Sequence, residues 1–421
     1  MKNRLLASLL SATALCAQPL LAAEPAEVVS TYADIAAATY ADSLSTAKAL
    51  QSAVDMLIAM PGEDTLQAAK TAWLAARVPY QQSEVFRFGN PIVDDWEGKV
   101  NAWPLDEGLI DYVDASYGGA TEENEFAALN VVATPKFTLS GSEIDATEIT
   151  PALIGETLHE ADGIESNVAS GYHAVEFMLW GQDLNGTGPG AGARPYTDYL
   201  TGDGCTNGHC DRRAAYLKAA TDLLVSDLDY MAKAWAEGGE ARAAVTADPA
   251  AGLSAMLTGM GSLSYGEQAG ERMKLGLMLN DPEEEHDCFS DNTHNSHYYD
   301  GLGVQNVYLG SYTRPDGSVV SGPSLSELVA AKDATLDETL KAELAASVAA
   351  LGAIKAKAES GTAYDQMLAA GNAEGEALIM GAVDALVTQT ASIERAVTAL
   401  GLNGIAFEGS DSLDNPNAVF Q

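Results

Sequence analysis

The stretch S-G-Y-H-A-V-E-F-M-L-W-G, residues 170–181, carries one ionisable pair on an otherwise apolar segment. Its apolar residues recur at helical spacing, and His173 and Glu176 stand three residues apart. On a helix, both side chains leave on nearly the same face, where an imidazole and a carboxylate can bind one metal ion. Ferritin-like bundles present metal ligands in a related way. The alternative is a histidine and a glutamate hydrogen-bonded to each other within a core.

A second candidate ligand is Glu84, on a helix predicted over residues 64–88. The helical spacing places this carboxylate on an aromatic face, where an unpaired charge is costly. An arginine, such as Arg77 or Arg87, or a metal ion must therefore compensate it.

Two adjacent acids follow Trp103-Pro104 in the turn N-A-W-P-L-D-E, residues 101–107. The residue before a proline is held extended, which keeps Asp106 and Glu107 close to the tryptophan. Asp106 can line a site or cap the start of a short helix, and the sequence leaves both interpretations open.

Residues 280–301 hold three of the six histidines of the chain in one turn-rich segment. A histidine and carboxylate cluster without a cysteine pair favours iron, manganese or calcium over a thiolate zinc site. A solvated polar loop is the alternative. The helix predicted before it carries Glu271 and Arg272. The candidate side chains of the segment are His286, Asp291, His294, His297 and Asp300.

The composition of the 421 residues is strongly acidic, with a formal net charge of −38. A basic start, an apolar run and small residues before Glu24 predict a secretory signal peptide over residues 1–23. Its removal takes Lys2 and Arg4 and leaves a net charge of −40. Such acidity argues against nucleic acid and anionic membranes as partners, because both are polyanions. Residues 1–23 are interpreted as a signal peptide and not as a membrane span, and no segment of the mature chain predicts a span.

Three cysteines remain in the predicted exported chain. Cys205 and Cys210 flank a short loop, and disulfides persist outside the cytosol, so we expect them to pair. A zinc knuckle with His209 is the weaker alternative, because no second pair of cysteines follows. Cys288 is left over, and the sequence does not settle its state.

The remaining pattern predicts two helical domains of ordinary size. Ala-rich amphipathic helices come before and after a stretch of glycine and proline that has no periodic face to bury. A weak correspondence in the order of features suggests that the two halves are related bundles. We therefore expect an N-terminal domain over residues 24–185, a linker over 186–210, a C-terminal domain over 211–402 and a tail over 403–421.

Three separated motifs resemble the imelysin family: G-x-H-x-x-E at Gly171, His173 and Glu176, W-P-L-D-E-G-L-I-D-Y-V, and E-H-D-C-F-S-D-N-T-H. The last motif, with N-V-Y-L-G-S-Y, is similar to the iron-regulated protein A branch of that family. The resemblance implies an all-α fold of two four-helix-bundle-like domains with a site where they meet. It also implies export to the periplasm or outer surface and a role in iron acquisition.

The family resemblance also implies a metallopeptidase that uses His173 and Glu176. The chain has neither H-E-x-x-H nor H-x-x-E-H, the patterns in which one helix supplies two zinc ligands. A peptidase further needs an activated water and a groove for a peptide, whereas a binding protein needs only ligands. We keep the peptidase as the alternative, and a helical scaffold without metal as a third class.

The sequence thus predicts a periplasmic metal-binding protein that acts in iron uptake or handling. Iron is the expected metal, with zinc or another divalent ion as alternatives, and an inner-membrane iron transporter is the expected partner. Arg87 and Arg272 could instead hold an anionic iron chelate through bidentate contacts, or orient the glutamates. The expected ligands are His173 and Glu176 first, then Glu84, Glu271, Asp291 and His294.

Overall fold

Helices dominate the structure, a computed structural model that describes residues 23–121 and 124–420. The all-α fold predicted from the sequence is confirmed. Strands form only two small antiparallel hairpins in these residues: β1 (Lys136–Leu139) with β2 (Ser142–Asp145), and β3 (Ser311–Thr313) with β4 (Val319–Ser321). The predicted signal peptide lies outside the described residues, apart from Ala23.

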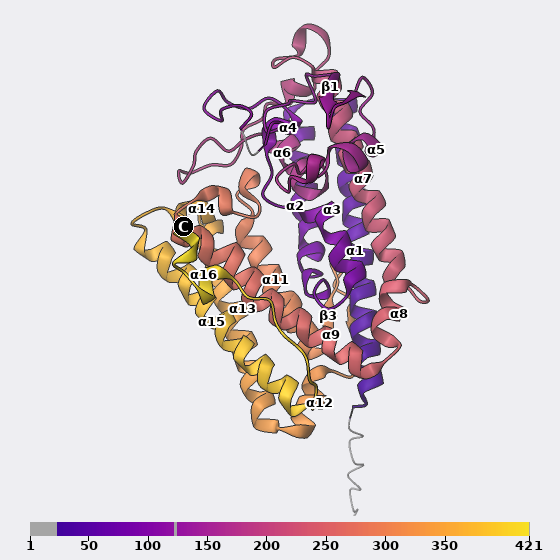
Figure 1. Cartoon of the computed structure of the whole chain (residues 1–421), viewed down its shortest axis with the longest axis vertical. Helices are drawn as coiled ribbons and strands as arrows, with labels where there is room; N and C mark the ends of the chain where they lie inside the picture. Colours follow the sequence, from indigo (N-terminus) through magenta and orange to yellow (C-terminus); the bar gives the residue numbers. More distant parts are fainter. Residues whose placement is uncertain (1–22, 122–123, 421) are drawn as a thin grey trace, which may run out of the picture.

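A first group of helices packs around α1, which runs nearly the full length of the molecule (Figure 1). Proline at the first turn and the Pro61-Gly62 pair after the last turn set the limits of α1. Its buried face lies against α2 and α7. The group consists of α1 (Pro25–Ala59), α2 (Glu63–Gln81), α3 (Pro91–Asn101), α6 (Gly171–Trp180) and α7 (Cys210–Trp235).

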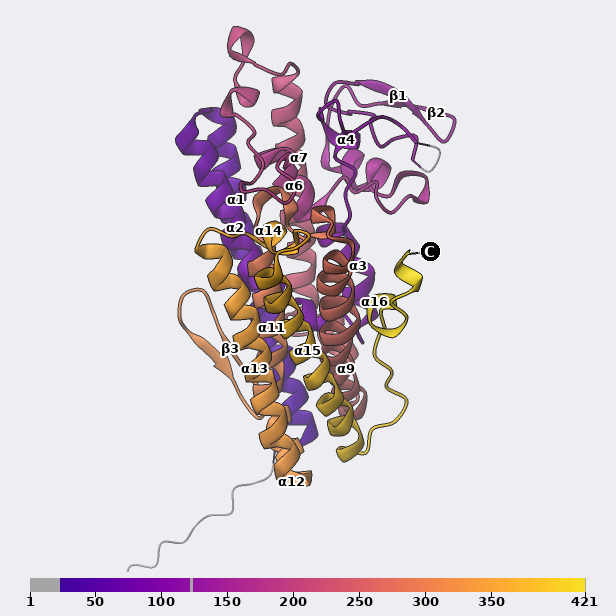
Figure 2. The same cartoon turned by 90° about the vertical axis from the view of Figure 1, so that its left-hand side faces the viewer.

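A second group forms an elongated bundle beside the first, with α13 and α15 as its long outer helices (Figures 1 and 2). Helices α9 and α10 and the π-helical stretch η6 between them follow one another without a break, and η6 is the part of the predicted helix that carries Glu271 and Arg272. The group consists of α9 (Pro249–Ser262), η6 (Leu263–Leu275), α10 (Gly276–Leu279), α11 (Thr293–Leu309), α13 (Ala334–Glu359) and α15 (Ala373–Ala399).

Shorter helices cap and connect these groups. They are α4 (Glu107–Ile110), α5 (Pro151–Leu153), α8 (Glu240–Thr246), α12 (Leu325–Lys332), α14 (Tyr364–Leu368), α16 (Asp411–Asp414), the short π-helix η2 (Ile154–Leu158) and the 3₁₀ turns η1 (Glu84–Phe86), η3 (Ala161–Gly163), η4 (Tyr196–Tyr199), η5 (Gly202–Gly204), η7 (Pro282–Glu284), η8 (Cys288–Ser290) and η9 (Ala418–Phe420).

The two groups meet along α2 and α11. Gly303 on α11 permits the close approach, because a Cβ there would lie 2.6 Å from the backbone oxygen of Gln82. The amide of Asn306 also donates a hydrogen bond to the side-chain oxygen of Gln82 at 3.0 Å. A continuous apolar core therefore runs from α1 through α11 to the start of α13.

Helix α7, which lies almost entirely within the C-terminal domain predicted over residues 211–402, contacts helices of the first group. The indole of Trp235 packs on the rings of Tyr32 and Tyr40, with ring centroids 5.9 and 6.3 Å apart. Two local features differ from the predicted ones. Helix α2 ends at Gln81, so Glu84 lies on the 3₁₀ turn η1, and residues from Thr293 onward form a helix instead of a loop.

Candidate metal centre

Helix α6 holds the centre of the candidate site, and all ten of its residues are buried. Gly171, at its first position, has a φ of +82°, and a Cβ there would lie 2.5 Å from the backbone oxygen of Val100. Only glycine fits both constraints. The glycine of the G-x-H-x-x-E motif thus seats α6 against the end of α3, and this fixes the position of His173.

His173, Glu176 and Asp287 form a compact group of potential ligands. One ligand atom from each lies within 4.8 Å of the others, and no other group of three histidine, cysteine, aspartate or glutamate residues meets this spacing in the described part of the chain. The Nδ1 atom of His173 lies 3.1 Å from Oε2 of Glu176 and 3.8 Å from Oδ1 of Asp287. All three side chains are fully buried.

Hydrogen-bond donors hold the two carboxyl groups in place. Asp287 accepts hydrogen bonds from Arg77 at 2.7 Å and from Asn292 at 2.7 Å. Glu176 accepts two from Ser290, from the backbone N–H at 2.9 Å and from the hydroxyl at 2.6 Å. These contacts preorganise the ligands, as outer-shell hydrogen bonds do in metal sites.

The protonation states suit a cation site. Burial and the charge of Arg77 lower the pKa of His173 to about 3, so its imidazole is neutral. Burial and the charge of Asp287 raise the pKa of Glu176 well above its ordinary value. Burial alone would raise the pKa of Asp287, but Arg77, His173 and two hydrogen bonds bring it below its ordinary value. The site thus offers one neutral imidazole, one carboxylate and one carboxyl group that can release its proton to a metal ion.

Asn101 and His286 separate the triad from an open cleft. The amide oxygen of Asn101 lies 3.2 Å from Nε2 of His173, and its amide nitrogen lies 3.0 Å from Nε2 of His286. The ring of Trp103 contacts the imidazole of His173 edge-on, with a centroid distance of 5.1 Å. These three residues also line the cleft, so they form the boundary between it and the triad.

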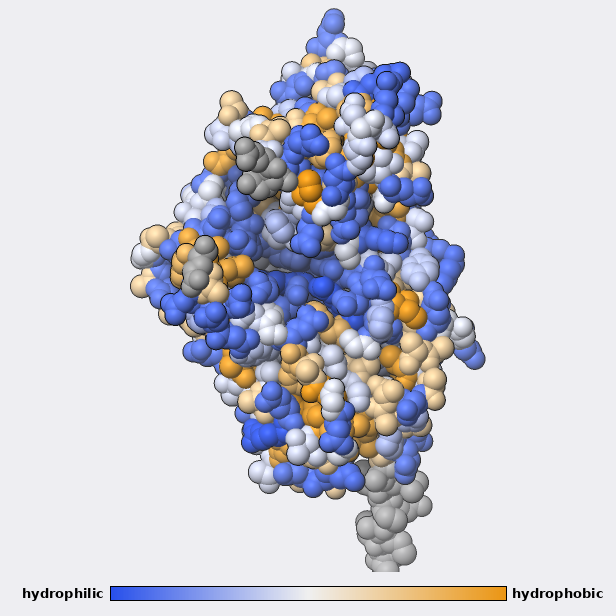
Figure 3. All heavy atoms as spheres, in the orientation of Figure 1, coloured by the Kyte–Doolittle hydropathy of each residue, from blue (hydrophilic) through white to orange (hydrophobic). Residues whose placement is uncertain are grey.

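The cleft itself has a volume of about 600 Å³ and lies between α3 and η6. Its lining is rich in carboxylates, namely Glu97, Glu160, Glu165, Glu267, Glu271 and Glu284. A hollow with hydrophilic side chains crosses the middle of the molecule in Figure 3. Arg87 and Arg272 also line the cleft, but the six carboxylates outnumber them, and an excess of negative charge on low-dielectric walls concentrates cations.

Glu84 and Arg272 form a buried ion pair near this cleft. The carboxylate of Glu84 lies 2.7 Å from the guanidinium of Arg272, which also contacts Asp300 at 3.1 Å and Glu267 at 2.7 Å. Arg272 therefore compensates Glu84, whereas the sequence analysis named Arg77 or Arg87 for this charge and Arg272 as one of two arginines that could orient the glutamates. Glu84 and Glu271 are not members of the triad, and Glu271 is exposed at the cleft.

Arg87 and Arg272 have little capacity left for an anionic chelate. Arg87 pairs with Asp94 at 2.9 Å, Glu267 at 3.5 Å and Glu97 at 3.6 Å. Since both guanidinium groups already face several carboxylates, they are better suited to orienting those carboxylates than to binding an anion.

Asp291 and His294 lie on the histidine-rich segment but are not members of the triad either. Burial lowers the pKa of His294 to about 4, and its Nε2 atom lies 3.0 Å from the amide of Asn295. Asp106 is the N-cap residue of α4, but its side chain makes no capping hydrogen bond. Its carboxylate instead accepts hydrogen bonds from Ser166 at 2.7 Å and Tyr117 at 3.1 Å.

The cysteines follow the expected pairing. Cys205 and Cys210 form a disulfide, which closes the loop before α7. Cys288 is free and buried, directly after the potential ligand Asp287.

Asp287, Arg77 and Asn101 were not selected from the sequence as parts of the site. The density of histidine and acidic residues did indicate the segment that carries Asp287. It could not single out this aspartate, because the contact with His173 joins the two halves of the chain. Arg77 had been considered only as a partner of Glu84.

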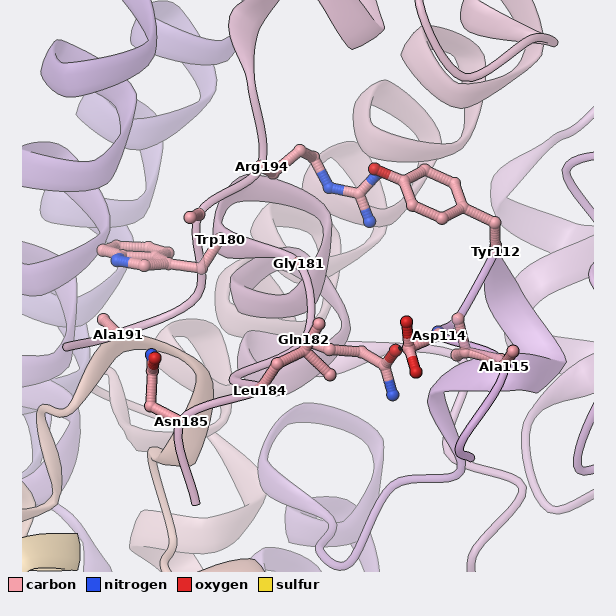
Figure 4. A pocket seen from close by; sticks show the side chains of 12 residues that line it. Tyr112, Asp114, Ala115, Trp180, Gly181, Gln182, Leu184, Asn185, Ala191 and Arg194 are labelled. Atoms are coloured by element: carbon pink, nitrogen blue, oxygen red, sulfur yellow. Dashed lines mark hydrogen bonds between the residues drawn. The ribbon is translucent and has the colours of Figure 1, made fainter. Parts of the chain in front are cut away.

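Another cavity, of about 390 Å³, lies at the C-terminal end of α6 (Figure 4). Arg194 and Tyr112 line one part of it, with the guanidinium 5.0 Å from the ring centroid. Trp180 and Leu184 supply apolar surface. The guanidinium is paired with Asp111 at 2.7 Å, so this cavity lacks the convergent donors of the triad.

The fold and the triad define a two-bundle helical protein with a buried centre suited to a cation. The sequence matches the Imelysin family (Peptidase_M75) over residues 36–393, and the chain belongs to this family. No curated protein sequence matches it. None of the helices described is both long and apolar enough to cross a membrane.

Two crystal structures share the fold. A protein from Parabacteroides distasonis assigned as an iron-regulated protein A precursor is 20% identical, with a TM-score of 0.65, over 91% of this chain and 97% of that one. An imelysin-like protein from Psychrobacter arcticum is 16% identical, with a TM-score of 0.55, over 92% of this chain and 100% of that one. At these identities, the similarity shows a shared fold and no more.

Proposed function

We propose that this protein is an exported iron-binding protein that acts in iron uptake or handling, with His173, Glu176 and Asp287 as ligands. The observation that carries the proposal is the buried triad, in which an imidazole and two carboxyl groups converge within 4.8 Å. Neutral imidazole and carboxylate are ligands that iron accepts readily. The iron-regulated protein A assignment of the P. distasonis neighbour supports iron as the cargo.

The depth of the triad favours binding over peptide hydrolysis. A metallopeptidase must bring an extended peptide and an activated water to an open metal position. Here the three side chains are fully buried, and Asn101, Trp103 and His286 lie between them and the cleft. A single ion can pass a boundary of side chains that a polypeptide cannot.

The acidic cleft suits the capture of a cation. Carboxylates on both walls attract positive ions and repel anions, which favours the free ion over an anionic chelate. An ion entering here meets Asn101 and His286, whose ring is neutral because burial and Arg272 lower its pKa well below the ordinary value. Both side chains carry acceptor atoms on the way to His173, which would exchange their present hydrogen bonds for contacts with the ion.

Export and delivery complete the proposal. The basic start, apolar run and small residues at the N-terminus favour secretion into the periplasm or to the outer surface. Iron bound there would pass to a transporter in the inner membrane. The strong negative charge of the chain suits a protein that gathers cations outside the cytoplasm.

Metal content of the secreted protein tests the proposal. The wild-type protein should carry near-stoichiometric iron, and a His173→Ala, Glu176→Gln variant should lose it. His209→Ala, which changes an exposed histidine, is the matched control and should keep the iron. Zinc in place of iron, together with cleavage of an unfolded substrate that the double variant abolishes, would establish the peptidase instead. Equal iron content in the wild-type and double-variant proteins would overturn the assignment of the site.

A further inference from the structure

A small cavity lies beside the segment that carries Asp287, apart from the triad, and it opens to solvent at the exposed side chain of Glu283. Its volume is about 10 Å³, which is the space of one water-sized sphere. Four carboxylates line it, together with Gly186, Pro282, Cys288 and Phe289. The carboxylates come from three separate parts of the chain and are those of Glu107, Asp183, Glu283 and Glu285.

Glu285 provides an independent sign of a missing ligand. Its side chain is 1% exposed and lines the cavity, and its Oε2 atom is buried without a hydrogen-bond partner. A buried carboxylate oxygen that lacks any donor is costly. A cation in the cavity would provide the compensating interaction.

The charges around the cavity are unbalanced. Within the part of the chain that the structure describes, no lysine, arginine or histidine forms an ion pair with any of the four carboxylates. Burial and the charges of Glu107, Asp281 and Asp183 raise the pKa of Glu283 to about 7. Glu283 therefore experiences mainly negative neighbours.

We propose that Glu107, Asp183, Glu283 and Glu285 form a second cation site that takes a hard divalent ion of the calcium class. Oxygen-only ligands select calcium or magnesium over softer transition metals. No three of these carboxylates have oxygen atoms within 4.8 Å of one another, so the ion keeps water molecules among its ligands.

The site would connect three segments of the chain. Glu107 begins α4, Asp183 follows α6, and Glu283 and Glu285 precede the ligand Asp287. An ion that binds all three segments would fix the position of Asp287 relative to α6. This role is distinct from iron binding at the triad and does not depend on it.

Terbium luminescence on the full-length secreted protein tests the second site. Terbium replaces calcium, and the indole of Trp103 can sensitise it, because this indole donates a hydrogen bond to the backbone oxygen of Glu283 at 3.2 Å. The measurement is made on the His173→Ala, Glu176→Gln variant, so that the triad does not compete. Calcium should displace the bound terbium.

Glu285→Gln in that background should weaken terbium and calcium binding by about tenfold or more. Glu338→Gln, an equal charge change on the exposed face of α13, should leave the affinity unchanged. If the Glu285 variant does not fold, the same affinities are measured on Asp183→Asn, whose side chain is partly exposed. Unchanged affinity in the folded cavity variants would overturn the second site. Iron content of the wild-type protein reports separately on the triad, so the two proposals can fail independently.

Discussion

The imidazole Nδ1 of His173 lies 3.8 Å from the carboxylate Oδ1 of Asp287, which joins the first bundle to the segment that precedes α11. Asp287 also pairs with Arg77 of α2 at 2.7 Å. The site therefore depends on the docking of the two helical groups, and a displacement of either one separates the ligands. A metal ion bound by both sides would in turn stabilise their association.

Replacement of Asp287 by asparagine should destabilise the metal-free protein by about 3 kcal/mol, because the buried Arg77 would lose its charged partner. Chemical unfolding in the presence of a chelator measures this change. Asp316→Asn, in an exposed turn, is the control and should change stability by less than about 0.5 kcal/mol. If the Asp287 and Asp316 variants lose equally little stability, the ion pair with Arg77 contributes nothing to folding.

Glutamine at position 176 should lower iron affinity by about tenfold or more, while it preserves the shape of the side chain. The amide keeps a hydrogen-bond partner for Ser290 but cannot supply a carboxylate. Competition titration against a chelator of known affinity measures the loss. A folded Glu176→Gln protein that binds iron as tightly as the wild type would exclude Glu176 as a ligand.

The local part of the site could be predicted from the sequence, whereas the long-range part could not. Spacing alone places His173 and Glu176 on one face of α6. Asp287, Arg77 and Asn101 join them only through tertiary packing, which hydrophobic periodicity does not encode.

The same distinction applies to the fold. The helix patterns predicted α6, α2 within the helix expected over residues 64–88, and the helix that carries Glu271 and Arg272, because apolar residues recur there at helical spacing. The predicted boundary at residues 186–210 was based on glycine content, which marks a loop but does not say which bundle the next helix contacts. Trp235 places α7 against α1, and the division of the chain into domains stays a prediction.

Iron binding should weaken as pH falls, because the ion competes with a proton on Glu176. Burial and the charge of Asp287 raise the pKa of this carboxyl group well above 4.5, so the metal-free site holds a proton that binding must release. Below that raised pKa, the apparent affinity should fall about tenfold for each pH unit. Calorimetry in buffers of different ionisation enthalpy counts the released proton. Binding without proton release would show that Glu176 is already ionised or takes no part.

The stability of the metal-free protein should fall as pH rises from about 6.5 to 8. Three carboxyl groups have a pKa of about 7 in the folded chain: Glu97, Glu283 and Asp291. Burial is the main cause in each case, and in the unfolded chain they ionise near 4.5 or 3.8. The folded state therefore binds more protons than the unfolded state in this range, so the free energy of unfolding decreases with pH.

Buried histidines act in the opposite direction but at lower pH, since His173 ionises at about 3 in the folded chain and at 6.5 when unfolded. The contribution of the histidines to the free energy of unfolding changes little above pH 6.5. The carboxyl groups therefore determine how that free energy changes with pH in this range. Thermal unfolding with chelator, at half-unit steps of pH, measures it. Glu97→Gln should flatten the decline, because glutamine has no proton to lose. A midpoint that stays constant or rises between pH 6.5 and 8 would show that these carboxylates are already ionised in the folded protein.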